Sequence, residues 1–129
     1  MPSPSEGAPP RVVVVEDQDK VRHVIVEALE AVGYRTSGFS TGEDALAHME
    51  ALAPALILVD IMMPGMNGLE FLDVLRARPS FAAIPVVIMS GLGASFPGVE
   101  RVKATAIIAK PIAFPLLIDE IKRIVVPPA

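Results

Sequence analysis

Three acids, one hydroxyl and one ammonium stand directly after short apolar runs of this sequence. They are Glu16, Asp17, Asp60, Ser90 and Lys110. If the three carboxylates converge, their repulsion raises at least one pKa unless a cation balances them. Oxygen ligands without His or Cys point to Mg²⁺, which keeps several waters and accepts one or two carboxylates and phosphate oxygens. A nucleophilic aspartate, a metal and a lysine for phosphate oxygens together indicate phosphoryl transfer to a carboxylate.

Each of these residues alone has a simpler structural explanation. A single Asp at the end of a strand is usually a turn or helix-capping residue, and Glu16 with Asp17 would also suit the cap of a helix. Ser90 would suit an ordinary turn, and Lys110 a solvated lysine before a structural proline. The coincidence of all of them at successive strand ends favours a shared site.

Five mostly apolar runs of four or five residues predict the strands that position this site. They are Val12–Val15, Arg35–Phe39, Leu56–Val59, Pro85–Met89 and Ala106–Ala109. Most have apolar side chains at successive positions, which is typical of strands buried on both faces. Ligands of an open parallel sheet bind beyond the carboxyl ends of its strands. The polar residues are therefore expected at one edge.

Helical spacing fills most of the segments between these runs. A first helix is predicted from an apolar stripe of Val21, Ile25, Ala28, Leu29 and Val32, ended by Gly33. Three more are predicted over residues 41–52, 68–77 and 114–126. The first eight residues of the segment 91–105 include three Gly and one Pro, which leaves room only for a short helix around residues 99–103. The alternation implies a parallel sheet with helices on both faces and right-handed crossovers.

Composition and charge exclude several classes of protein. The 129 residues suit one domain, predicted over residues 11–126 between a Pro-rich tail at 1–10 and a short tail at 127–129. The net charge of −4, without a Lys/Arg cluster, disfavours nucleic acid and anionic membranes as partners. The absence of Cys excludes disulfides and thiol chemistry. With no secretory signal and no membrane-length apolar run, we expect a cytoplasmic protein.

With these motifs the chain resembles the receiver domain of two-component response regulators. The resemblance is carried by Arg11–Asp17, by Leu-Val-Asp-Ile-Met-Met-Pro-Gly-Met-Asn-Gly ending at Gly68, by Val-Ile-Met-Ser-Gly ending at Gly91, and by Ala-Lys-Pro ending at Pro111. It implies a flavodoxin-like, or CheY-like, doubly wound α/β fold. Its five parallel strands would lie in the order 2-1-3-4-5, with an irregular or shortened fourth helix.

The resemblance also implies a role for each site residue. Asp60 would accept a phosphoryl group from a sensor histidine kinase or a histidine phosphotransfer protein. Mg²⁺ would be held by Asp17, by Asp60, by the backbone carbonyl of Met62 and, mainly through water, by Glu16. Ser90 and Lys110 would contact phosphoryl oxygens, with a cis peptide bond before Pro111 to aim the lysine.

Two features depart from the family pattern. Many members carry an aromatic switch residue three positions before the lysine, where this sequence has the stiff, β-branched Ile107. The stretch from Ser90 to Lys110 is also slightly short and rich in Gly, so we expect a non-standard readout to an unknown downstream protein. Met62, Met63 and Met66 follow the phosphoacceptor, and we expect them to slow hydrolysis of its phosphate.

Three functional hypotheses remain open from the sequence. The first is a stand-alone receiver, either a monomer or a phosphorylation-linked dimer, that binds a partner or relays phosphate. The second is a pseudo-receiver, an interaction module that never takes phosphate. The third is a haloacid-dehalogenase-like phosphohydrolase, which needs a second acid two residues after the nucleophile, where this chain has Met62. His23 and His48 are expected to be solvated or partly packed, without a catalytic role.

Overall fold

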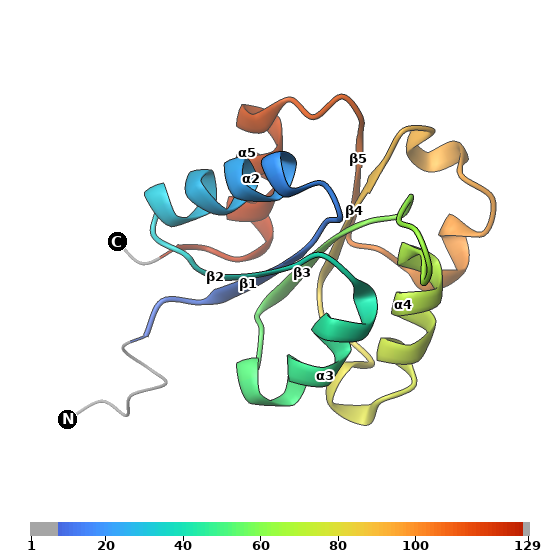
Figure 1. Cartoon of the computed structure of the whole chain (residues 1–129). Coiled ribbons are helices and arrows are strands. Elements are labelled where there is room, and N and C mark those ends of the chain that lie inside the picture. Colours follow the sequence, from blue (N-terminus) through green and yellow to red (C-terminus); the bar gives the residue numbers. More distant parts are fainter. Residues whose placement is uncertain (1–7, 128–129) are drawn as a thin grey trace.

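The computed structural model describes residues 8–127 and contains one five-stranded parallel sheet (Figure 1). The strands are β1 (Arg11–Val15), β2 (Arg35–Phe39), β3 (Leu56–Asp60), β4 (Val86–Ser90) and β5 (Ala106–Ala109). They lie in the order β2-β1-β3-β4-β5, and every neighbouring pair is parallel. The predicted flavodoxin-like fold and strand order are confirmed. The predicted tails lie largely outside the described residues.

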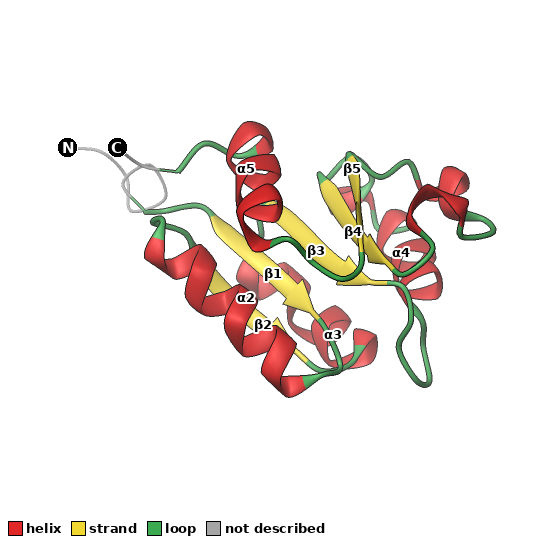
Figure 2. Ribbon diagram, turned by 90° about the horizontal axis from the view of Figure 1, so that it is seen from above, coloured by secondary structure: helices red, strands yellow, loops and turns green. Residues whose placement is uncertain are grey.

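Four α-helices cover the two faces of the sheet within the described chain. They are α2 (Asp19–Ala31), α3 (Gly42–Leu52), α4 (Gly68–Arg76) and α5 (Phe114–Ile124). Helices α2 and α5 lie on one face, and α3 and α4 lie on the other (Figure 1). The strands run side by side between these two layers (Figure 2). The last helix ends at Ile124, two residues before the predicted end.

Local chemistry sets the ends of these helices. Gly33 follows α2 with a φ of 107°, the left-handed conformation that favours glycine after a helix. Thr41 caps α3 by accepting a hydrogen bond from the N–H of Asp44 at 3.1 Å. Asn67 and Glu70 form a reciprocal capping box at the start of α4. The last of these caps fixes the helix that follows the Asp60 loop.

The core has two layers because the central strands are buried on both faces. Every residue of β3 and β4 is buried, whereas the edge strands β2 and β5 are partly exposed. One layer joins alternate strand residues to α3 and α4, and the other joins the remaining ones to α2 and α5. Burying this apolar surface supplies most of the free energy that holds the polar edge together.

The crossover between β4 and β5 is irregular, as predicted from its glycines. It contains two short 3₁₀ turns, η2 (Gly93–Ser95) and η3 (Val99–Val102), and no α-helix occurs between residues 91 and 105. Val99 and Val102 are buried in the layer of α3 and α4, and Phe96 packs against the same layer. The segment is therefore fastened by a few apolar side chains instead of a full helical face.

Gly68 determines how closely α4 approaches the end of β3. A Cβ atom at this position would lie 2.5 Å from the carbonyl oxygen of Asp60 and 2.8 Å from Cα of Ile61. Both are backbone atoms, so no side-chain rotation would relieve the overlap. The glycine is required because the loop after Asp60 folds back on its own strand.

We predict that Gly68→Ala lowers the free energy of unfolding by about 1–3 kcal/mol, because the loop must move away from the strand. Gly91→Ala is the matched control, since a Cβ atom there would meet nothing within 4 Å. Urea unfolding of both variants measures the difference. Equal stabilities for the two variants would contradict the steric argument.

Candidate functional site

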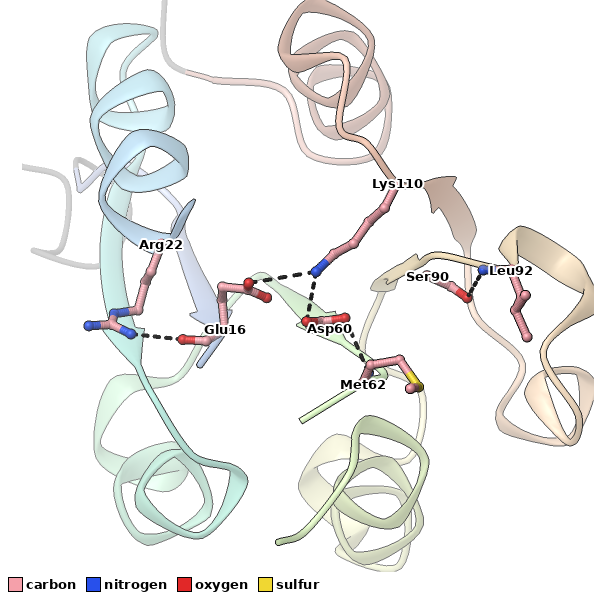
Figure 3. Close-up of polar contacts among 7 residues, drawn as sticks. All are labelled: Glu16, Arg22, Asp60, Met62, Ser90, Leu92 and Lys110. Carbon is pink, nitrogen blue, oxygen red and sulfur yellow. Dashed lines mark hydrogen bonds and ion pairs between the residues drawn. The ribbon is translucent and has the colours of Figure 1, made fainter. Parts of the chain in front are cut away.

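The structure brings the predicted site residues to one edge of the sheet. Glu16 and Asp17 follow β1, Asp60 ends β3, Ser90 ends β4 and Lys110 follows β5. One carboxylate oxygen each from Glu16, Asp17 and Asp60 lies within 4.8 Å of the others. Figure 3 shows Lys110 reaching from the far strand toward Glu16 and Asp60.

Asp60 lies at the centre of the cluster and is only 2% exposed. Its Oδ2 accepts a hydrogen bond from Nζ of Lys110 at 2.8 Å, and its Oδ1 accepts one from the N–H of Met62 at 3.2 Å (Figure 3). The carboxylate is therefore held from two directions. A reacting group must approach it through a narrow opening, because so little of the side chain meets solvent.

Glu16 is wholly buried, and neither of its carboxylate oxygens has a hydrogen-bond partner among the described residues. Its nearest cation, Nζ of Lys110, lies 3.6 Å from Oε1. The pKa of Glu16 is raised to about 8, chiefly by burial and then by the neighbouring Asp60, to which a protonated Glu16 can donate, and by the charge of Asp17, while Lys110 acts in the opposite direction. The charge of Glu16 is therefore only partly compensated, because Lys110 lies closer to Asp60 than to Glu16.

This arrangement fits a hard divalent cation. The donors are oxygen atoms, their mutual spacing suits one ion, and the unpartnered buried oxygens of Glu16 would gain a partner from a metal or its waters. The N–H of Met62, bonded to Asp60, also keeps this stretch of backbone close to the carboxylates. The residues present therefore suit Mg²⁺.

Lys110 is the cation that the structure places beside the acids. Burial alone would lower the pKa of its ammonium, but the hydrogen bond and charge of Asp60, together with Glu16, raise it above its ordinary value. Its backbone N–H donates to the carbonyl of Ser90 at 2.9 Å, and the bond from Lys110 to Pro111 is cis. The lysine is therefore charged and attached to the end of β4.

Ser90 is fully buried at the end of β4. Its Oγ accepts a hydrogen bond from the N–H of Leu92 at 3.1 Å (Figure 3). A hydroxyl that accepts this bond can still donate its own hydrogen to another group. Ser90 is thus suited to donate to an anion at the edge of the sheet.

The three methionines of the Asp60 loop occupy different environments. Only Met62 is strongly exposed, at 64%, whereas Met63 is 7% exposed and belongs to the core. Met66 packs close to Gly42, so that a Cβ atom there would lie 3.0 Å from its sulfur. The loop thus places one methionine at the rim of the site and uses the other two for packing.

Ile107 and the histidines lie away from the acidic cluster. Ile107 is half-buried in β5 and packs against the layer of α3 and α4. His23 is exposed, and the ring of His48 stacks on Phe39 with centroids 5.4 Å apart. The expected solvated or partly packed histidines are confirmed.

Sequence reasoning missed one residue of the site. Arg22 lies outside the apolar stripe predicted for the first helix, yet its side chain is only 15% exposed. Its Nη1 donates to the backbone carbonyl of Glu16 at 2.8 Å (Figure 3). The available signal was its position, because the first turn of α2 must face the strand end that it follows.

The fold and the site define a doubly wound α/β domain in which three acids and a lysine lie together at one edge of the sheet. The family model for the response regulator receiver domain matches residues 12–122, so the chain belongs to that family. It is thus a receiver domain of the kind found in two-component signalling, which is a signalling domain.

Relatives and solved structures agree with this family. The chain is 29% identical over 118 residues to the phosphate regulon transcriptional regulatory protein PhoB of Rhizobium meliloti, covering 88% of this chain and 51% of PhoB. It is 34% identical over 80 residues to the DNA-binding response regulator MtrA of Mycobacterium tuberculosis, covering 62% and 34%. The chain therefore spans about half or less of these proteins.

A solved structure with a similar fold is the chemotaxis protein CheY4 of Vibrio cholerae. It superimposes with a TM-score of 0.82 at 25% identity, covering 91% of this chain and 99% of CheY4. Unlike the two regulators above, CheY4 is matched over nearly its whole resolved length. No helix among the residues that the structure describes is long and apolar enough to cross a bilayer.

The buried Glu16 carboxyl gives the metal-free protein a specific pH dependence. Its pKa is about 8 in the folded protein and 4.5 ordinarily, so between these values the folded state holds a proton that the unfolded chain releases. The contribution of Glu16 to the free energy of unfolding therefore falls as the pH rises from about 4.5 to about 8, by at most about 1.4 kcal/mol per pH unit. Above that range it is constant.

We predict that Glu16→Gln, which cannot ionise, removes this component. In EDTA, urea unfolding across the same pH range should show the variant gaining on the wild type as pH rises. Adding Mg²⁺ at pH 8 should stabilise the wild type more than the variant. A stability difference that does not change with pH would contradict the assigned pKa.

Proposed function

We propose that this domain accepts a phosphoryl group onto Asp60 in the presence of Mg²⁺ and passes the signal on as a phosphorylated receiver. The observation that carries the proposal is the ion pair of Asp60 with Lys110 at 2.8 Å, next to the unpartnered carboxylate of Glu16. A nucleophilic carboxylate, a nearby cation and further oxygen ligands are what phosphoryl transfer to aspartate requires. The family match supports the same function.

The donor would be a phosphohistidine of a sensor histidine kinase or a histidine phosphotransfer protein. The phosphorus–nitrogen bond of the donor breaks as a carboxylate oxygen of Asp60 bonds to phosphorus. The histidine nitrogen keeps the electron pair of the broken bond, and Asp60 becomes an acyl phosphate. The attacking group is a carboxylate, so the step itself releases no proton.

The chain's own residues position the groups of this reaction. Asp17, Asp60 and the backbone carbonyl of Met62 would hold Mg²⁺, with Glu16 acting mainly through water. When bound, the ion supplies positive charge that offsets the charge of the phosphoryl group. Lys110 exchanges its bond to Asp60 for one to a phosphoryl oxygen, and Ser90 donates its hydroxyl hydrogen to another.

An apolar recess beside Lys110 supports an approach of the donor from this side. Its lining is mostly apolar and comes from the start of α2, the loop before α5 and the first residue of α5: Gln18, Val21, Lys110, Pro111, Ile112 and Phe114. Because Asp60 is almost wholly buried, a donor protein must seat closely against the edge of the sheet to bring its histidine within reach. We propose that this apolar surface contacts the donor.

The downstream readout is proposed to depend on the irregular crossover. Ser90 lies immediately before residues 91–105, and the N–H of Leu92 is bonded to its hydroxyl. A movement of Ser90 toward a phosphoryl oxygen would break or redirect that bond and so alter the segment. The half-buried Ile107, which packs in the same layer as Val99 and Val102, would follow without an aromatic rotamer switch.

The two alternative functions have less support. A phosphohydrolase would need an acid at the position of Met62, which carries an exposed thioether side chain. A pseudo-receiver would not need a buried acid, a lysine and a hydroxyl to converge on one edge. The phosphorylated domain would then act by binding a protein, by dimerising or by relaying the phosphate onward, depending on its downstream partner.

We predict that the purified protein, incubated with Mg²⁺ and acetyl phosphate, gains one phosphoryl group by intact mass, because among residues 8–127 the side chain of Lys110 donates a hydrogen bond to the carboxylate of Asp60 alone. Asp60→Asn should gain none, since an amide cannot attack phosphorus. Lys110→Ala should react far more slowly. A wild type that neither gains mass nor binds Mg²⁺ would favour the pseudo-receiver instead.

Met62 is predicted to lengthen the life of the acyl phosphate, because its N–H is bonded to Asp60 and it carries an exposed apolar side chain at that point, where it would hinder water. Met62→Ala should lose phosphate several times faster than the wild type. Val74→Ala, which shortens an exposed apolar side chain of α4, is the control. Decay of the phosphorylated mass after donor removal measures the effect, and equal decay in both variants would refute it.

A further inference from the structure

Arg22 lies on α2, outside the set of acids, hydroxyl and lysine that forms the site. Its side chain is 15% exposed although it carries a charge. Nη1 donates to the backbone carbonyl of Glu16 at 2.8 Å, and Nη2 pairs with Oδ1 of Asp19 at 2.6 Å. In Figure 3 the guanidinium lies on one side of Glu16 and Lys110 lies on the other.

The contact with Glu16 fixes the backbone of the acidic pair. The N–H of Glu16 donates to the carbonyl of Phe39 at 3.0 Å, so its amide is tied to the end of β2. Arg22 ties the carbonyl on the other side, and that carbonyl belongs to the same peptide group as the N–H of Asp17. Both bonds together set where the two carboxylates point.

The start of α2 has no side-chain cap among the residues that the structure describes. Gln18 occupies the N-cap of α2, but its side chain makes no capping hydrogen bond. Asp19 is 75% exposed, so its ion pair with Arg22 lies largely in solvent and contributes little. Of the two contacts of the guanidinium, the bond from Nη1 to the carbonyl of Glu16 is therefore the one that matters for the site.

Gly38 provides the room for this side chain. A Cβ atom at Gly38 would lie 3.2 Å from Cδ and 3.3 Å from Cγ of Arg22. The arginine stem passes over the glycine on its way from α2 to Glu16. A residue on β2 and a residue on α2 thus cooperate to deliver one hydrogen bond to the strand end between them.

We propose that Arg22 is a positioning residue for the metal-binding acids, acting through the carbonyl of Glu16, with Gly38 as the space that admits it. The inference rests on the proposed function, because it concerns the same Mg²⁺ site. Losing a hydrogen bond that orients a metal ligand typically weakens metal binding by about 10- to 100-fold. Arg22 touches neither the phosphoryl group nor the metal.

The test is Mg²⁺ affinity, measured by calorimetric titration of the whole chain. Arg22→Met keeps the apolar stem and removes the donors, and it should weaken Mg²⁺ binding roughly tenfold. Asp19→Asn is the matched control, since it removes the exposed ion pair and keeps the bond to Glu16. Its Mg²⁺ affinity should stay within about twofold of the wild type. That change is far smaller than the loss of affinity expected when a hydrogen bond that orients a metal ligand is removed.

Two further measurements separate positioning from general loss of structure. The amide ¹⁵N resonance of Asp17 in metal-free protein should shift in Arg22→Met and stay in place in Asp19→Asn, because only the first loses the bond to that peptide group. Gly38→Val, which keeps the guanidinium but fills the space of its stem, should weaken Mg²⁺ binding in the same direction. Urea unfolding in EDTA should show every variant folded.

The outcomes distinguish this inference from the proposed function. If the wild type binds no Mg²⁺, the proposed function fails. If the wild type binds Mg²⁺ and folded Arg22→Met binds it equally well, the proposed function stands and the role of Arg22 is wrong. Equal losses in Arg22→Met and Asp19→Asn would also overturn it, because the exposed ion pair would then be responsible.

Discussion

Buried negative charge at the carboxyl edge of the sheet is the constraint on which the rest of this structure depends. Glu16 and Asp60 are almost completely removed from solvent, and Lys110 pairs closely with only one of them. Charges in such an environment are costly unless they are paired. The fold accepts that cost because the apolar layers on both faces of the central strands hold the strand ends together.

This excess of buried negative charge over positive charge favours the binding of a cation, and Lys110 provides a positive charge for an anion. A divalent ion would stabilise the ionised form of Glu16, whose pKa is raised by burial. The ammonium of Lys110, which is held at Asp60 by their ion pair, is in place to bind phosphate oxygens. Backbone contacts then set the geometry: Met62 supports Asp60 from within its loop, and Gly68 lets that loop fold tightly onto the strand. The chemistry proposed for the site follows from these contacts.

Much of this arrangement could be predicted from the sequence, because parallel strands place their final residues at one edge. The run that ends at Asp60 predicted both a buried strand and an emerging acid, and the glycines after Ser90 predicted the irregular crossover. Side-chain direction could not be read in the same way. Periodicity left Arg22 outside the apolar stripe of its helix, and adjacency grouped three methionines that have different environments in the loop. Both depend on close tertiary contacts that local patterns do not encode.

The central claim is that Asp60, a metal and Lys110 together receive a phosphoryl group. A crystal structure of the protein grown with Mg²⁺ and beryllium fluoride, which mimics a phosphoryl group on a carboxylate, tests this most directly. The account predicts beryllium fluoride on a carboxylate oxygen of Asp60, Mg²⁺ between it and Asp17, and Lys110 moved from Asp60 onto a fluorine. Beryllium fluoride at another residue, or none at all with Mg²⁺ present, would contradict it.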